Sequence, residues 1–133
     1  MVKVYSSSPL REQLTERELQ GLVRDFKVYK ITGQSPALFG RDVLFDHPHT
    51  LPILVSEQVR HVHLLPESER PSLSQKDQFN RTSDQHLIYC EGFKNTNAYL
   101  LIAILRPNAH EQERNNEVMY RLGLMAEKFR ARF

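Results

Sequence analysis

The chain has 133 residues, of which 40% are hydrophobic and 26% charged, and its formal net charge is +2. This length fits a single domain over residues 1–133, which is large enough to bury a core without disulfides or a metal. Free-standing proteins that bind nucleic acid tightly usually carry more positive charge. So modest a charge would suit a protein that binds part of an RNA already held by another assembly. The alternative is that the basic residues near the C-terminus are only the solvated end of a helix.

The chain contains one cysteine and no long apolar segment. A single thiol cannot form a disulfide within the chain, which is typical of a reducing compartment, and we expect Cys90 to be a small buried hydrophobic side chain. The longest apolar run, Ala98–Leu105, is far shorter than the ~20 residues of a membrane span, and the N-terminus has no apolar signal segment. These features predict a soluble, cytoplasmic protein with no membrane partner.

The N-terminal part predicts a short strand and then a helix. Val2–Tyr5 has the pattern of a strand, which ends at the following serines and proline. Thr15 and Glu18 have the spacing of a capping box, in which each side chain accepts a hydrogen bond from the backbone of the other. Gly33 is the predicted helix end. The apolar stripe of this helix consists of Leu19, Leu22, Val23 and Phe26.

The middle of the chain predicts one strand between two irregular segments. Pro36–Pro52 and Glu67–Asn80 lack periodicity and are rich in turn-forming residues. Val59–Leu65 alternates as a strand does, with Val62 and Leu64 on one face. His61 and His63 therefore share the opposite face.

The C-terminal half predicts a hairpin and a long helix. His86–Phe93 and Ala98–Arg106 read as strands, and their short, turn-rich connection favours antiparallel pairing. The second strand is apolar on both faces, so we expect it to be central and most buried. Beyond Pro107 apolar residues recur at helical spacing up to Phe133. The order of elements predicts an α+β fold in which helices back an antiparallel sheet, with a C-terminal helix.

Several blocks of sequence are spread over nearly the whole chain, namely Phe39–Asp42, His61–Leu64, Arg81–Asp84, His86–Cys90, Leu100–Leu105, Met125–Arg130 and Arg132–Phe133. These blocks, in this order, resemble the YafO family of toxins from bacterial type II toxin–antitoxin systems. This resemblance implies a RelE-like toxin architecture and a ribosome-dependent endoribonuclease that cleaves translated mRNA and inhibits protein synthesis. It implies three partners, namely the ribosome, mRNA and a cognate YafN-like antitoxin, and we expect no metal and no cofactor.

Metal-free RNA cleavage needs a base for the 2′-OH, an acid for the leaving 5′-oxygen and cations around the phosphate. Histidine suits both proton transfers because its ordinary pKa of about 6.5 lies near working pH. The planar guanidinium of arginine can hold two phosphate oxygens at once. We expect the sheet face that carries the paired histidines to be open to RNA. The predicted catalytic residues are His61, His63, Arg81 and His110.

Basic residues in the C-terminal region are predicted to contact the RNA or ribosome backbone. His110 and Arg114 are spaced to share one helical face, where Arg114 would hold a phosphate. Asp84 is expected to orient Arg81 or a histidine, or else to cap a turn, and Tyr89 to stack on a base or to lie in the core. The predicted contacts to RNA or ribosome are Arg106, Arg114, Lys128, Arg130 and Arg132.

Two alternative functions remain open at this stage. A non-catalytic module that binds RNA or the ribosome would need the basic residues but not the imidazoles. A metal-dependent hydrolase would use carboxylates and histidines as ligands, although their spacing fits no standard metal motif. The candidate ligands are Asp42, Asp46, His47, His49, His61 and His63.

Overall fold

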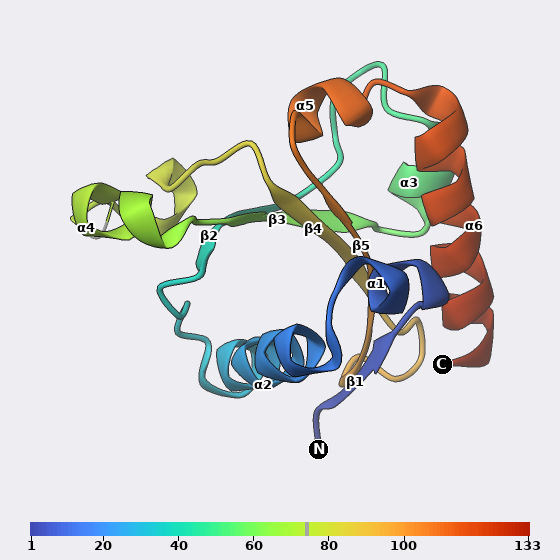
Figure 1. Ribbon diagram of the computed structural model, residues 1–133. Helices are drawn as coiled ribbons and strands as arrows, with labels where there is room; N and C mark the ends of the chain where they lie inside the picture. Colours follow the sequence, from blue (N-terminus) through green and yellow to red (C-terminus); the bar gives the residue numbers. More distant parts are fainter. Residues whose placement is uncertain (74) are drawn as a thin grey trace.

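The computed structural model describes residues 1–73 and 75–133, and within them five strands form one sheet (Figure 1). The strand order is β1-β5-β4-β3-β2. Strand β1 runs parallel to β5, whereas the other neighbouring strands are antiparallel. The strands are β1 (Lys3–Ser6), β2 (Phe39–Leu44), β3 (Arg60–Leu64), β4 (His86–Glu91) and β5 (Ala98–Leu105).

Helices cover both faces of the sheet. Helices α1 and α2 lie on one face, and α3 and α6 pack together on the other (Figure 1). The predicted α+β class and C-terminal helix are thereby confirmed. None of the helices in the described part of the chain is long and apolar enough to cross a membrane. The helices are α1 (Ser8–Gln13), α2 (Glu16–Thr32), α3 (Pro52–Ser56), α4 (Arg70–Leu73), α5 (Ala109–Gln112) and α6 (Asn116–Arg132), with 3-10 turns at Glu67–Glu69 and Gln78–Asn80.

Helix α2 begins and ends where the sequence predicts. The Thr15 hydroxyl accepts from the Glu18 N–H at 3.1 Å, and the Glu18 carboxylate accepts from the Thr15 N–H at 2.9 Å. At the other end Gly33 has a φ of 73° and donates its N–H to the Tyr29 carbonyl. That left-handed conformation suits glycine because it has no Cβ. The capping box and the helix end are both confirmed.

Alternation along the strands, interrupted by a register shift between β4 and β5, divides the apolar residues between two cores. Beneath α1 and α2, Phe26 packs with Val62 and Tyr89. On the other face, apolar residues of α6 pack against a group that includes Cys90. Burial raises the pKa of the Cys90 thiol to about 12, which confirms its role as a small hydrophobic side chain. Tyr89 is fully buried, so it belongs to the core and does not stack on a base.

The predicted antiparallel sheet is confirmed in part. The sheet is mostly antiparallel, but the parallel β1–β5 pair makes it mixed, and the ninety-odd residues between these strands allow a crossover connection. Strand β5 is an interior strand and is almost wholly buried, as predicted, but the middle strand is β4. Phe39–Leu44 is a strand within the segment predicted to be irregular, and the segment Glu67–Asn80 contains short helical turns. Ser74, in that second segment, lies outside the described residues.

A buried carboxylate holds β2 against helix α2. Asp42 accepts hydrogen bonds from the hydroxyls of Tyr29 at 2.7 Å and Tyr89 at 2.6 Å. The Nε of Arg60 donates to it at 3.2 Å, and the Lys30 ammonium lies 3.6 Å away. The Asp42 side chain is only 5% exposed. These long-range partners explain why a segment without strand periodicity forms a strand.

We predict that Asp42→Ala lowers the free energy of unfolding by about 3 kcal/mol, because it leaves a partly buried guanidinium and two phenols without their acceptor. Urea unfolding measured by circular dichroism checks this value. Asp46→Ala, at an exposed position of the following loop, is the matched control and should change stability by less than about 0.5 kcal/mol. Equal losses of stability in Asp42→Ala and Asp46→Ala would contradict the role of Asp42 in holding β2 against α2.

Candidate active site

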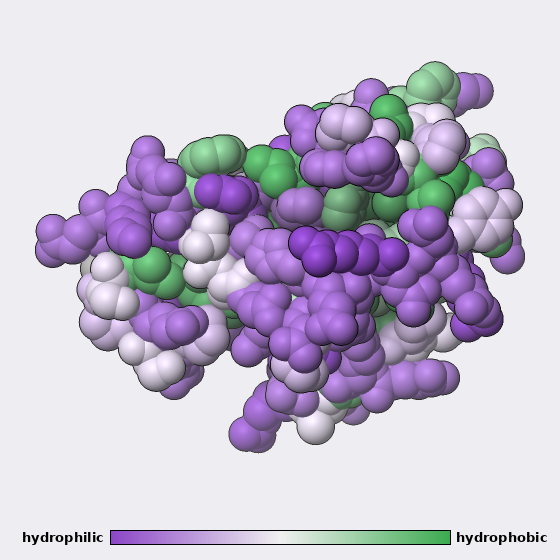
Figure 2. Space-filling model, turned by 90° about the horizontal axis from the view of Figure 1, so that it is seen from above, coloured by the Kyte–Doolittle hydropathy of each residue, from purple (hydrophilic) through white to green (hydrophobic). Residues whose placement is uncertain are grey.

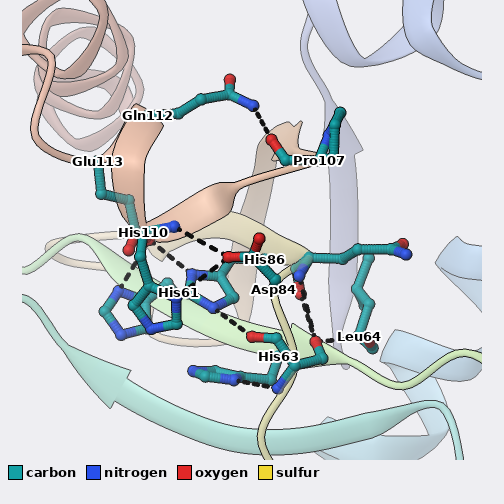
Figure 3. A network of polar contacts seen from close by, with 11 residues as sticks. His61, His63, Leu64, Asp84, His86, Pro107, His110, Gln112 and Glu113 are labelled. Carbon is teal, nitrogen blue, oxygen red and sulfur yellow. Dashed lines mark hydrogen bonds and ion pairs between the residues drawn. The ribbon is translucent and has the colours of Figure 1, made fainter. Parts of the chain in front are cut away.

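The pairing of β3 with β4 brings histidines from both strands to one face of the sheet. His63 lies directly opposite His86, and His61 lies opposite Ile88. Val62 and Leu64 pack into the core under α1 and α2, so His61 and His63 share the other face as predicted. That face is not open, however, since His63 is 2% exposed and His86 is fully buried. The turn that carries helix α5 covers them (Figure 3).

Four imidazole rings converge at this point, and we call His61, His63, His86 and His110 the histidine cluster (Figure 3). The ring centroids of His63 and His86 are 4.0 Å apart, and those of His86 and His110 are 4.8 Å apart. His61 lies 5.2 Å from His86 and 5.9 Å from His63, and His63 lies 6.0 Å from His110. The predicted catalytic histidines are therefore neighbours, although they come from β3 and α5.

The backbone of a single residue, Ser83, contacts two of these rings. Its N–H donates to Nδ1 of His63 at 2.8 Å, so the neutral ring of His63 carries its hydrogen on Nε2. Its carbonyl oxygen lies 3.0 Å from Nε2 of His86 and can only accept, so that nitrogen carries a hydrogen as well. The loop before β4 thus sets the orientation of both buried rings.

Glu113, which follows α5, places a carboxylate between two imidazoles. Its Oε2 lies 2.8 Å from Nδ1 of His86 and 3.5 Å from Nδ1 of His61. Because Nε2 of His86 already donates to a carbonyl, the short contact holds one proton between His86 and Glu113. Nδ1 of His61 is buried and makes no hydrogen bond. The Glu113 side chain is 11% exposed.

His110 is the exposed member of the histidine cluster. Its side chain is 64% exposed, and Nδ1 lies 3.2 Å from Oδ1 of Asp84, which leaves Nε2 directed away from that carboxylate. The same oxygen accepts from the His110 backbone N–H at 3.4 Å. The slight burial of Asp84 raises its pKa, but the hydrogen bonds from His110 outweigh this and lower it overall. Asp84 therefore both orients a histidine and caps a turn, as its two predicted roles allow.

Burial keeps two members of the histidine cluster neutral at neutral pH. Loss of solvent, with a smaller contribution from neighbouring rings, lowers the pKa of His63 to about 3. The same loss of solvent lowers the pKa of His61 to about 4, although the Glu113 carboxylate opposes the change. At neutral pH the rings of His61 and His63 are therefore uncharged, and each has one nitrogen that can donate a hydrogen bond and one that can accept.

Two arginines, Arg81 and Arg41, bear on this region, and only Arg81 has a predicted role there. Nε of Arg81 donates to the Lys76 carbonyl, and Arg81 lines a cavity of about 540 Å³ to which no member of the histidine cluster contributes. Its backbone packs against Gly40, where a Cβ would lie 2.1 Å from the Arg81 carbonyl oxygen. The charge of Arg41 helps to lower the pKa of His63, and its guanidinium lies 4.1 Å from the Phe79 ring centroid. Arg41 is therefore the arginine beside the site.

The other predicted basic contacts fall into two groups. Arg130 is 8% exposed, lies 3.6 Å from the Glu57 carboxylate and donates to the Ser56 carbonyl, so it is a structural link between α3 and α6 and is not available to RNA. Arg114 lies beyond the end of α5, so the predicted helical face shared with His110 is wrong. The predicted contacts to RNA or ribosome that are exposed are Arg106, Arg114, Lys128 and Arg132.

The ligand set predicted for a metal-dependent hydrolase does not assemble. Asp42 pairs with Val62 across the sheet and lies on the face opposite His61. His47 and His49 are exposed and pack against each other, with ring centroids 5.3 Å apart. Among the described residues, the groups of three with ligand atoms close enough for a metal are His63, His86 and His110, and His61, His86 and Glu113.

Sequence reasoning missed His86 and Glu113, and it gave no role to Arg41. His86 alternates with Ile88 and Cys90, so the pattern alone places it on their face of β4. Its pairing with His63 follows only from the register of the hairpin with β3. Glu113 lies 27 residues from His86 in sequence, and its contact with the ring has no local signal.

The surface above the histidine cluster is mainly polar. Figure 2 views the molecule from the side on which α5 lies in Figure 1, and most of this face is hydrophilic, with apolar side chains in separate patches. Together with the exposed His110 ring, this surface suits a polar or charged ligand.

The fold and the histidine cluster define a small α+β protein with an acid–base site of the kind that supports proton transfer. A family model described as "Toxin YafO, type II toxin-antitoxin system" matches residues 27–131. The "mRNA interferase toxin YafO" of Escherichia coli (strain K12) is 45% identical over 133 residues, covering 99% of this chain and 100% of the relative. The chain belongs to the YafO family of type II toxin–antitoxin toxins. No solved structure matches it.

We predict that acid destabilises the fold through His63. Its pKa is about 3 in the folded protein and 6.5 when unperturbed, so the unfolded chain binds more protons between these values, and stability falls as pH falls through this window. Between pH 7.5 and pH 5, His63 alone should account for a loss of about 1–2 kcal/mol. Urea unfolding at pH 7.5 and at pH 5 measures this loss of stability. EDTA is present at both pH values so that the protein is free of metal.

The control is His63→Gln, whose side-chain oxygen can still accept from the Ser83 N–H but does not titrate. Its stability should fall less than that of the unsubstituted protein over the same pH range. Identical pH dependence in the two proteins would contradict a buried neutral His63.

Proposed function

We propose that the protein is an mRNA interferase, a metal-independent endoribonuclease that cleaves translated mRNA and thereby inhibits protein synthesis. The observation that carries this proposal is the convergence of three imidazoles, those of His61, His63 and His86, beneath the exposed ring of His110 on a mainly polar face. Family membership and the name of the relative, mRNA interferase, support it.

The reaction uses the RNA's own 2′-OH. A base removes its proton, the 2′-oxygen forms a bond to the adjacent phosphorus, and the bond from phosphorus to the 5′-oxygen breaks. An acid supplies a proton to the departing 5′-oxygen. The products are a 2′,3′-cyclic phosphate and a free 5′-OH, so no water or metal enters this step.

His110 is assigned the proton transfer closest to solvent. The Asp84 carboxylate holds its Nδ1, which leaves Nε2 for an RNA oxygen, and Asp84 is a positioning residue. His61, whose side chain is 14% exposed, is the second proton-transfer residue. His63 and His86 are buried and position the other two rings through the contacts within the histidine cluster.

Positive charge for the phosphate comes from arginine. Arg41, whose charge acts on His63, takes the phosphate-binding role that the sequence suggests for Arg81. Other exposed basic side chains, outside the histidine cluster, contact the RNA or ribosome backbone. Each phosphate that they neutralise adds a salt-dependent contribution to the binding free energy. These side chains are Arg106, Arg114, Lys128 and Arg132.

The small net charge of +2 supports a requirement for the ribosome, because a weakly charged protein depends on another assembly to hold its RNA. The family also implies a cognate, YafN-like antitoxin that binds and neutralises the toxin. The mixed sheet between helices is compatible with a RelE-like toxin architecture, and we include that architecture in the proposal. The site of action is the cytoplasm, where translation takes place.

We predict that His110→Ala reduces mRNA cleavage on translating ribosomes by about 10²–10⁴-fold, the usual contribution of one proton-transfer group. Primer extension of mRNA isolated after induction measures the cleavage. Because the His110 side chain is exposed, we expect its removal to change the stability of the fold little, and urea unfolding of the variant checks this. His49→Ala, an exposed histidine outside the cluster, is the matched control and should cleave normally. Full activity of His110→Ala would overturn the assigned role.

We further predict that purified protein cuts mRNA on translating ribosomes at least tenfold faster than the same RNA free in solution, and that EDTA pretreatment of the toxin leaves the rate unchanged. The reaction is followed by gel electrophoresis of a labelled message. Equal cleavage of free and ribosome-bound RNA would refute the ribosome requirement. A growth effect without any cleavage would favour the non-catalytic module.

A further inference from the structure

Beneath the exposed histidine lies a group of three ligand atoms that the proposed reaction leaves unexplained. Nδ1 of His61 is buried without a hydrogen-bond partner. A buried polar atom without a partner costs free energy and calls for a physical reason. It lies 3.5 Å from Oε2 of Glu113, which in turn lies 2.8 Å from Nδ1 of His86.

These separations suit a small divalent ion. Two ligands bound at about 2.1 Å in a tetrahedral site are roughly 3.4 Å apart. The observed contacts to Glu113 bracket that value, and one ligand atom of each of the three residues lies within 4.8 Å of the other two. Two imidazoles and one carboxylate, with a fourth position left for water, form a donor set that zinc uses in proteins.

The surroundings of His86 also fit a metal ligand. Histidines that bind metals usually donate their other ring N–H to a carbonyl or carboxylate, which fixes the ring. Nε2 of His86 donates to the Ser83 carbonyl at 3.0 Å, which leaves Nδ1 as the ligand atom. The cation would take the place of the proton held between His86 and Glu113.

We infer that His61, His86 and Glu113 form a binding site for a divalent transition-metal ion of the Zn²⁺ type, through Nδ1, Nδ1 and Oε2. The other group of three possible ligands, His63, His86 and His110, is a poorer metal site. Nδ1 of His63 accepts from the Ser83 N–H, so its Nε2 carries a hydrogen and has no free lone pair for a metal.

The consequence for activity rests on the proposed function. A bound cation removes His61 from proton transfer and fixes His86 beside His110. The metal therefore inhibits a nuclease that works without one, and free zinc concentration would regulate the toxin.

The binding test uses the full chain, stripped with EDTA. Isothermal titration with Zn²⁺ should give one site per chain, and Co²⁺ should produce the visible absorption of a four-coordinate ion. Glu113→Gln and His61→Ala should each weaken Zn²⁺ binding at least tenfold. His47→Ala/His49→Ala removes the exposed histidine pair, and His110→Ala removes the other candidate ligand, and both variants should bind normally.

The outcomes separate the site from its alternatives. Absence of a Zn²⁺ site in the unsubstituted protein overturns the inference, and that result does not depend on the folding of any variant. Unchanged binding in both Glu113→Gln and His61→Ala also overturns it. Loss of binding in His110→Ala with retention in His61→Ala assigns the metal to the other group and refutes the site proposed here.

Cleavage assays on translating ribosomes test the regulatory role separately. Inhibition by stoichiometric Zn²⁺ and recovery in EDTA support it. Binding with no effect on cleavage overturns inhibition, and cleavage that requires Zn²⁺ overturns both inhibition and the metal-independent mechanism. If no cleavage occurs with or without EDTA, the proposed function fails while the binding result stands.

Discussion

The antiparallel register between β3 and β4 is the constraint on which the site depends. Val62 opposite Leu87 faces the core under α1 and α2, and this burial fixes which residues point the other way. Because side chains alternate along a strand, a slip of one residue would send His61 and His63 into that apolar core. Packing on one face of the sheet therefore determines the chemistry on the other.

Two carboxylates with low exposure, one on each side of the sheet, are compensated in different ways. Asp42 is held by two phenols and a guanidinium, groups that keep their protons at neutral pH. Glu113 is held by two imidazoles, with its Oε2 at 2.8 Å from Nδ1 of His86 and 3.5 Å from Nδ1 of His61. The first arrangement is suited to holding β2 in place. The second is less completely compensated, because Nδ1 of His61 makes no hydrogen bond.

Features that arise from local periodicity could be predicted from the sequence. The capping box of α2, the β4–β5 hairpin and the shared face of His61 and His63 all depend on residues close together in the chain. The family resemblance supplied the function. The α+β class followed from the order of these elements.

Features that depend on distant partners could not be predicted. Strand β2 is held by Asp42, whose partners come from α2, β3 and β4. Arg130 reads as one of several basic residues at the C-terminus, yet it is buried against Glu57, more than seventy residues away. The contact of Glu113 with His86 likewise depends on how the end of α5 meets the sheet. In each case the deciding interaction is tertiary.

The backbone of Ser83 determines how the two buried rings tolerate sequence change. Its N–H and carbonyl belong to the main chain, so a new side chain at position 83 keeps both groups. Such a substitution acts instead through the Ser83 hydroxyl, which donates to the Leu64 carbonyl at 2.7 Å and so anchors the loop to β3. Proline is the exception, since it has no amide hydrogen and would leave the His63 acceptor unpaired while the His86 contact remained.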